Sequence, residues 1–182
     1  LIILGGIGFP VIREVLKRRF NFKKLSMHSK IALSVSGVLL AAGTLLLKLT
    51  ENVTWLGAFF MSVSARTAGF SSYNLANFTG AGLFVIIILM FIGASPGSTG
   101  GGIKTTTFFV LLQGIKKSAT NRTEKAFKYS VPRDAYKKAS VITLLGVAVS
   151  VTGTYLMLLF DPQLTFMQAF FEIVSAFGTV GL

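Results

Sequence analysis

Two long apolar stretches constrain the fold of this chain more than any other feature of its sequence. Residues 31–49 and 139–160 are near-continuous apolar runs, and each has about the 20 residues that a membrane-crossing helix needs. Over the whole chain, 52% of residues are hydrophobic and only 13% are charged, which is too apolar for an ordinary soluble surface. The sequence therefore predicts an all-α integral membrane protein.

A shorter aromatic segment and a glycine loop follow each long stretch. Residues 54–65 lead to a Thr-Ala-Gly triplet at 67–69, and residues 164–176 lead to a Thr-Val-Gly triplet at 179–181. The aromatic segments are too short to span a bilayer, so we predict re-entrant half-helices whose loops are buried in protein or line a water-filled cavity. The pattern predicts tandem repeats of helix, half-helix, loop and helix.

The repeated loop predicts a selectivity filter for a dehydrated cation. Glycine lacks a Cβ, so it permits the unusual dihedral angles with which backbone carbonyls converge on an ion. One Thr-x-Gly triplet is common by chance and could be a plain re-entrant connection, whereas two copies at matching positions favour a shared role. We expect a potassium ion to be bound by the carbonyl oxygens of six residues: Thr67, Ala68, Gly69, Thr179, Val180 and Gly181.

A glycine-rich segment interrupts the apolar region that follows the first loop. Five glycines and one proline occur in ten positions, and in a helix interior each glycine costs about 1 kcal/mol and proline about 3. We predict a broken transmembrane helix whose break acts as a gate, with a purely structural kink as the alternative. The predicted gate comprises Gly93, Ala94, Ser95, Pro96, Gly97, Ser98, Thr99, Gly100, Gly101 and Gly102.

The segment at 97–105 also has a superficial likeness to a phosphate-binding loop. The full pattern fails because Lys104 follows Ile103 rather than glycine, and no strand precedes it. The chain has no cysteine, and its sequence offers no paired carboxylates, metal-ligating cluster or nucleophile with a base. We predict that the protein is not an enzyme and uses no cofactor; a membrane-embedded nucleotide-dependent enzyme is the alternative.

The basic residues give the chain its net charge of +12 and predict its topology. Seven of the eighteen lie between Arg13 and Lys30, and nine lie between Lys104 and Lys138. Two clusters that flank apolar segments are typical of cytoplasmic loops under the positive-inside rule. Basic residues are little interleaved with aromatic residues in these loops, so we predict no nucleic-acid partner.

Two charged residues fall inside the short aromatic repeats. Arg66 precedes the first loop, where a cation facing the ion path would repel potassium; we expect it behind the filter, paired with an acidic group or with loop carbonyls. Glu172 lies in the second short segment, where a carboxylate at membrane depth is a functional or pairing candidate. We expect both to support the filter, and a contact between Arg66 and Glu172 is one hypothesis.

Three segments give the chain a resemblance to the Trk/Ktr/HKT superfamily of potassium transporters, and most closely to the membrane subunit of a bacterial Ktr-type system. They are residues 64–70 (Ser-Ala-Arg-Thr-Ala-Gly-Phe), 97–107 (Gly-Ser-Thr-Gly-Gly-Gly-Ile-Lys-Thr-Thr-Thr) and 175–182 (Ser-Ala-Phe-Gly-Thr-Val-Gly-Leu). The middle segment is the most specific of the three. The resemblance implies four repeats of helix, pore helix, filter loop and helix around one pseudo-fourfold pore.

On this resemblance, the chain is an internal piece of a longer multi-pass protein of the plasma (inner) membrane. Residues 1–29 would end the second repeat, 30–115 would form the third with its gate at 93–102, 116–138 would be a basic cytosolic linker, and 139–182 would be a fourth repeat truncated at its filter. The resemblance implies potassium uptake, homodimerisation and regulation by a cytosolic nucleotide-binding ring subunit, and leaves sodium dependence open. The alternative function is a non-conducting scaffold whose basic loops recruit a cytosolic partner or membrane lipids.

Overall fold

The computed structural model describes residues 1–120, 125–126, 129–130 and 133–182. Helices dominate this part of the chain, and two short strands, β1 (Lys125–Ala126) and β2 (Tyr129–Ser130), form an antiparallel pair. Single 3-10 turns cover Phe22–Lys24 and Leu75–Asn77. The helices are α1 (Ile2–Ile7), α2 (Phe9–Lys17), α3 (Met27–Thr50), α4 (Trp55–Ser64), α5 (Gly80–Phe91), α6 (Thr105–Thr120), α7 (Arg133–Phe160) and α8 (Phe166–Gly178).

Two of the described helices, α3 and α7, are long and apolar enough to cross a membrane. Each contains one of the two long apolar stretches of the sequence. Many large apolar side chains of α7 are exposed, among them Leu144 and Phe160 at 70% and 87%. An apolar surface of this extent suits the hydrocarbon of a bilayer or further helices better than water.

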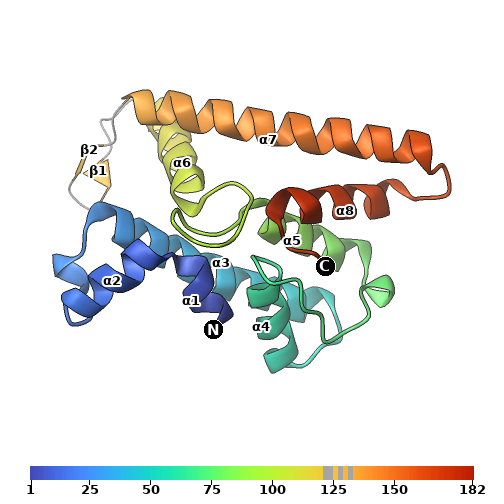
Figure 1. The fold of residues 1–182 in the computed structure, drawn as a ribbon, viewed down its shortest axis with the longest axis horizontal. Helices are drawn as coiled ribbons and strands as arrows, with labels where there is room; N and C mark the ends of the chain where they lie inside the picture. The colour runs from blue at the N-terminus through green and yellow to red at the C-terminus, as the bar shows by residue number, and fades with distance from the viewer. Residues whose placement is uncertain (121–124, 127–128, 131–132) are drawn as a thin grey trace.

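Short helices fill the space between these two long ones. In Figure 1, α7 runs along one edge of the molecule, and α8 and α5 lie between it and α3. Helix α3 packs against α4 and α5, α7 packs against α8, and a contact between α5 and α8 joins the two groups. Phe91 at the end of α5 stacks on Phe177 of α8, with ring centroids 5.6 Å apart.

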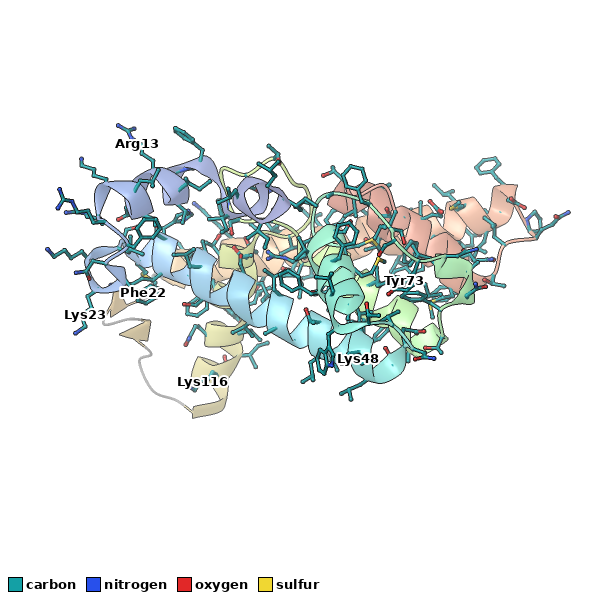
Figure 2. The ribbon with its side chains drawn as sticks, turned by 90° about the horizontal axis from the view of Figure 1, so that it is seen from below. Arg13, Phe22, Lys23, Lys48, Tyr73 and Lys116 are labelled. Carbon is teal, nitrogen blue, oxygen red and sulfur yellow. The ribbon has the colours of Figure 1, made fainter. Side chains whose placement is uncertain are left out.

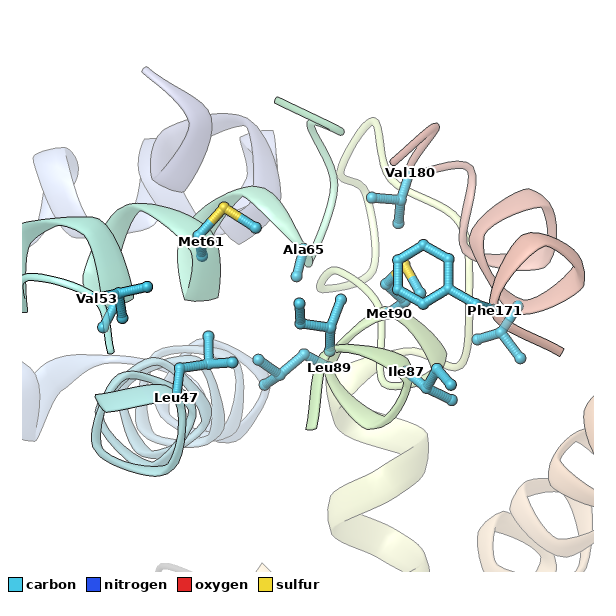
Figure 3. Close-up of a cluster of buried hydrophobic side chains, with 12 residues drawn as sticks. Leu47, Val53, Met61, Ala65, Ile87, Leu89, Met90, Phe171 and Val180 are labelled. Carbon is cyan, nitrogen blue, oxygen red and sulfur yellow. The ribbon is translucent and has the colours of Figure 1, made fainter. Parts of the chain in front are cut away.

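A buried apolar cluster lies where these short helices meet. Figure 3 shows Leu47 of α3 and Met61 of α4 on one side of the cluster, and Met90 of α5, Phe171 of α8 and Val180 on the other. Leu47, Met61 and Met90 have no exposed surface. In a membrane such contacts are stabilised by close packing, because lipid tails are as apolar as the side chains themselves. The cluster therefore holds together the helices that lead into both glycine loops.

One glycine of α3 allows three helices to approach closely. A Cβ placed on Gly43 would lie 2.5 Å from the Ser62 hydroxyl of α4 and 2.7 Å from a methyl group of Leu89 on α5. Ser62 also donates a hydrogen bond of 3.1 Å to the backbone carbonyl of Leu40 on α3. Small residues and interhelical hydrogen bonds of this kind are typical of helix contacts in membranes.

The start of the chain, expected to end the second repeat, contains two short helices rather than one continuous helix. Gly8 divides it into α1 and α2 with φ of 92°, a left-handed conformation that glycine adopts at little cost. A Cβ on Gly8 would also lie 2.7 Å from the carbonyl oxygen of Pro96. The break follows from this close approach of the 93–102 loop, which the local sequence does not encode.

The helices around the basic linker extend further than expected. Helix α6 continues to Thr120 and α7 begins at Arg133, so both enter the region predicted as a linker at 116–138. Residues 121–124, 127–128 and 131–132 of that prediction lie outside the described residues.

Candidate functional site at two glycine loops

The two repeated loops lie in direct contact although they are far apart in the sequence. A Cβ on Gly69 would collide with the carbonyl oxygen of Val180 and would lie 2.9 Å from that of Gly181. Both loop glycines have positive φ, 68° at Gly69 and 79° at Gly181, the region that side chains with a Cβ rarely adopt. The structure thus brings the two predicted filter segments together.

A serine at the end of the preceding helix fixes the first loop. The backbone carbonyl of Ser64 accepts hydrogen bonds from the amides of Ala68 (2.9 Å) and Gly69 (3.3 Å). The Ser64 hydroxyl donates to the backbone carbonyl of Phe70 at 2.5 Å. Both ends of the Thr-Ala-Gly triplet are therefore tied to a residue that is itself fully buried.

A second serine, Ser175 of α8, fixes the other loop with a different pattern. Its carbonyl accepts from the amide of Val180 at 2.9 Å, and its hydroxyl accepts from the amides of Gly181 and Leu182, both at 3.1 Å. The sequence prediction did not assign roles to the two serines. Their shared signal is the Ser-Ala dipeptide that opens both repeated segments, at 64–65 and at 175–176.

The carbonyl oxygens of the predicted filter residues are free of hydrogen bonds within the described chain. No hydrogen bond between described residues ends on the carbonyls of Thr67, Ala68, Gly69, Thr179, Val180 or Gly181. Backbone carbonyls in protein interiors are usually paired. Such oxygens have lone pairs available for a cation, and backbone carbonyls are the ligands of potassium-selective filters.

The predicted gate segment lies against both loops. Residues 92–104 are not helical and connect α5 to α6, as Figure 1 shows. At the start of the segment, the Arg66 guanidinium donates to the carbonyl of Gly93 at 3.0 Å. At its end, the amide of Gly101 donates to the Thr179 hydroxyl at 2.7 Å, and that of Gly102 donates to the carbonyl of Phe177 at 3.2 Å. One loop anchors the beginning of the segment and the other anchors its end.

The glycines of this segment permit that position. A Cβ on Gly100 would collide with the side chain of Thr67, and one on Gly101 would lie 2.8 Å from the Thr179 methyl group. The Lys104 ammonium donates to the carbonyl of Gly100. Any larger side chain at either glycine would therefore push the segment away from the threonine of one loop.

The middle of the segment is tied to the first two helices. The amide of Ser95 donates to the carbonyl of Gly6 at 2.9 Å, and the amide of Phe9 donates to the carbonyl of Gly97 at 3.1 Å. The Thr105 hydroxyl at the start of α6 donates to that of Ser95 at 2.9 Å. A movement of the 93–102 segment would consequently break contacts with α1, α2 and both loops.

The structure separates the two charged residues that were expected to support the filter. Arg66 is 6% exposed, and of the two kinds of partner expected for it, the structure gives a loop carbonyl, that of Gly93. Glu172 of α8 is exposed, while Phe171 and Ser175 of the same helix are buried. The hypothesised contact between Arg66 and Glu172 is not formed in the described chain, because the buried guanidinium donates to Gly93 while Glu172 is exposed.

The basic residues gather at one end of the molecule. Figure 2 shows Arg13, Lys23 and Lys116 at this end, with Lys48 away from it, where its ammonium donates to the carbonyl of Val53 at 2.7 Å. At the basic end, the Glu14 carboxylate of α2 accepts hydrogen bonds from the start of α3. These hydrogen bonds lower the pKa of Glu14 below its ordinary value. The bond from the Ser29 hydroxyl has the largest effect, followed by the bonds from Ser26.

The sequence has clear relatives among known transporters. It is 39% identical over 196 aligned residues to the Ktr system potassium uptake protein B of Vibrio alginolyticus, and 38% identical over 199 to the potassium/sodium uptake protein NtpJ of Enterococcus hirae. Each alignment covers 100% of this chain but only 43% and 44% of the relative. The chain therefore spans less than half the length of these relatives.

A solved structure and a protein family also match this chain. The crystal structure of the potassium transporter TrkH from Vibrio parahaemolyticus matches with a TM-score of 0.70 and 18% identity, over 93% of this chain and 39% of that one. Residues 31–182 match the family described as TrkH, cation transport protein. The chain belongs to the TrkH family of cation transport proteins.

Proposed function

We propose that this chain forms part of a potassium uptake pathway, in which the triplets at 67–69 and 179–181 contribute backbone carbonyls to a selectivity filter. The observation that carries the proposal is the direct contact of the two loops through Gly69 and Val180. A potassium ion that leaves water needs oxygens to replace its hydration shell. The six carbonyls of these loops are free of hydrogen bonds in the described chain and can supply part of that shell, and the rest of the longer protein would supply the remainder.

The segment at 93–102 is the gate of this pathway in our proposal. Its hydrogen bonds toward the two loops are one from the charged Arg66 side chain, worth about 1.5–3 kcal/mol, and ordinary ones from Gly101 and Gly102, worth about 0.5–1.5 kcal/mol each. Two arrangements of the segment can therefore be close in free energy, as a switch between a closed and an open state requires. A partner that binds one arrangement more tightly would shift the population toward it.

The basic end is the cytosolic face of the protein in this proposal. Its cluster of lysines and arginines suits the cytoplasmic side of the plasma membrane, with anionic lipid headgroups close by. Several relatives are named as proteins of a Ktr system, and in our proposal a cytosolic nucleotide-binding ring subunit regulates this protein, which assembles as a homodimer. A scaffold that only recruits such a partner through this end is the alternative.

Potassium uptake by the full-length protein in transport-deficient cells tests the filter. We expect wild type to restore uptake, and Gly181→Ser and Gly69→Ser to weaken it or to admit sodium. Gly80→Ser is the matched control, because a Cβ at Gly80 meets nothing within 4 Å and its φ is not positive. A membrane-inserted wild type without any flux, tested with its cytosolic partner, would favour the scaffold. Varying sodium in the same assay measures sodium dependence.

A further inference from the structure

Two buried polar atoms behind the first loop lack hydrogen-bond partners. Within the described part of the chain, the Ser36 hydroxyl of α3 and the Arg66 Nε are buried and unpaired. Their residues are 4% and 6% exposed. A buried polar group without a partner is costly, and more so when it is charged. Each such atom in a native structure calls for an explanation, and an ordered water is a common one.

Both residues line the same small cavity. It has about 20 Å³ of room for a water-sized sphere, and about 10–15 Å³ on this measure is enough for one water molecule. Thr67, the first residue of the first loop, and Gly6 of α1 also line it. The cavity is mostly apolar, with Ser36, Arg66 and Thr67 as its polar lining residues, and it has room for about one water molecule.

We propose that one buried water molecule occupies this cavity and bridges Ser36 to Arg66. The water would accept a hydrogen bond from the Arg66 Nε–H and share another with the Ser36 hydroxyl. Both orphaned atoms then gain a partner, as buried waters typically provide. The bridge joins the long helix α3 to the arginine that precedes the first loop.

This water makes Ser36 a positioning residue for Arg66. One terminal nitrogen of the guanidinium donates to the carbonyl of Gly93, and the water holds Nε on the side of α3. With a partner at two points, the planar group is fixed in orientation. Ser36 then acts on the start of the 93–102 segment through Arg66, without touching it.

A structure of the full-length protein at a resolution that reveals ordered waters tests the site directly. We expect a single peak within hydrogen-bonding distance of both Ser36 Oγ and Arg66 Nε, lost in Ser36→Ala. Thr44→Val is the matched control, because it removes a hydroxyl of the same helix that donates to the carbonyl of Leu40; it should keep the peak. An empty cavity in wild type, a larger anion in its place, or a peak unchanged in Ser36→Ala would overturn the proposal.

The effect of Ser36 on transport rests on the proposed function and is measured separately, as rubidium flux. In proteoliposomes without the activating partner, we expect Ser36→Ala to raise rubidium flux about two- to tenfold, the factor that one ordinary hydrogen bond is worth. Ser36→Thr keeps the hydroxyl and should stay near wild type, and none of these variants should change selectivity. If the water is lost while flux is unchanged, Ser36 does not position Arg66. A wild type without flux contradicts the proposed function, while the density still decides the water site.

Discussion

The two glycine loops have similar sequences but are held in place differently. Arg66 precedes the first triplet and reaches the start of the 93–102 segment with a charged side chain. Gly178 precedes the second triplet, and there Thr179 adopts a left-handed conformation with φ of 53° and accepts a hydrogen bond from Gly101. The repeated sequence therefore determines where the two loops lie. The residues next to each triplet determine which end of the 93–102 segment that loop contacts.

The largest expected difference concerns the loop glycines themselves. Gly69→Ala places a Cβ against the carbonyl of Val180, whereas at Gly181 the added Cβ meets nothing within 4 Å. Positive φ alone costs a residue with a Cβ about 1–2 kcal/mol, so we expect Gly181→Ala to lower potassium uptake roughly 5- to 30-fold. Gly69→Ala adds a collision with a backbone carbonyl, which cannot move aside as the end of a side chain can, and should abolish uptake, the largest effect that we expect. Equal losses in uptake assays, with surface expression matched, would show that the contact seen at Gly69 does not matter for transport.

The two anchors of the 93–102 segment form the next comparison. A hydrogen bond from a charged group contributes about 1.5–3 kcal/mol, so Arg66→Gln should release the segment and raise partner-free rubidium flux roughly 10- to 100-fold. Thr179→Val removes only the hydroxyl that accepts from Gly101, and an ordinary hydrogen bond predicts a rise of about two- to tenfold. Flux that falls in both variants would indicate that the anchors hold an open rather than a closed pathway.

Replacing the two serines that fix the loops should destabilise the protein to different extents. Ser175→Ala leaves the amides of Gly181 and Leu182 without their acceptor, whereas Ser64→Ala removes one donor to the carbonyl of Phe70. Two unpaired amides cost more than one unpaired carbonyl, which has a second lone pair and tolerates loss better. We expect a larger fall in melting temperature and in potassium over sodium selectivity for Ser175→Ala. The reverse order would place the more important support at the first loop.

The sequence predicted the elements better than their contacts. Apolar run lengths located α3 and α7, the short aromatic segments located α4 and α8, and the glycines and Pro96 located the break between α5 and α6. These features depend on local residue types. The split at Gly8 and the exposure of Glu172 depend on which segments meet in space, so no local pattern could indicate them. For Arg66, the sequence indicated two kinds of partner, and only the fold selects the carbonyl of Gly93.

The hydrogen bonds of Glu14 lie away from both loops, so their loss should have the smallest effect of the changes considered. Hydrogen bonds from Ser29 and Ser26 lower the pKa of Glu14 below 4.5, so its carboxylate stabilises the fold at pH above 4.5. That contribution is lost as pH falls through the lowered pKa. We expect Glu14→Gln to lower the melting temperature slightly at pH 7, with the gap to wild type closing in acid. Because Glu14 contacts neither loop, the flux ratio of the Gly69 and Gly181 variants should be the same in the Glu14→Gln background. A changed ratio would mean that the contact between α2 and α3 also reaches the loops, through the hydrogen bond between Phe9 and Gly97.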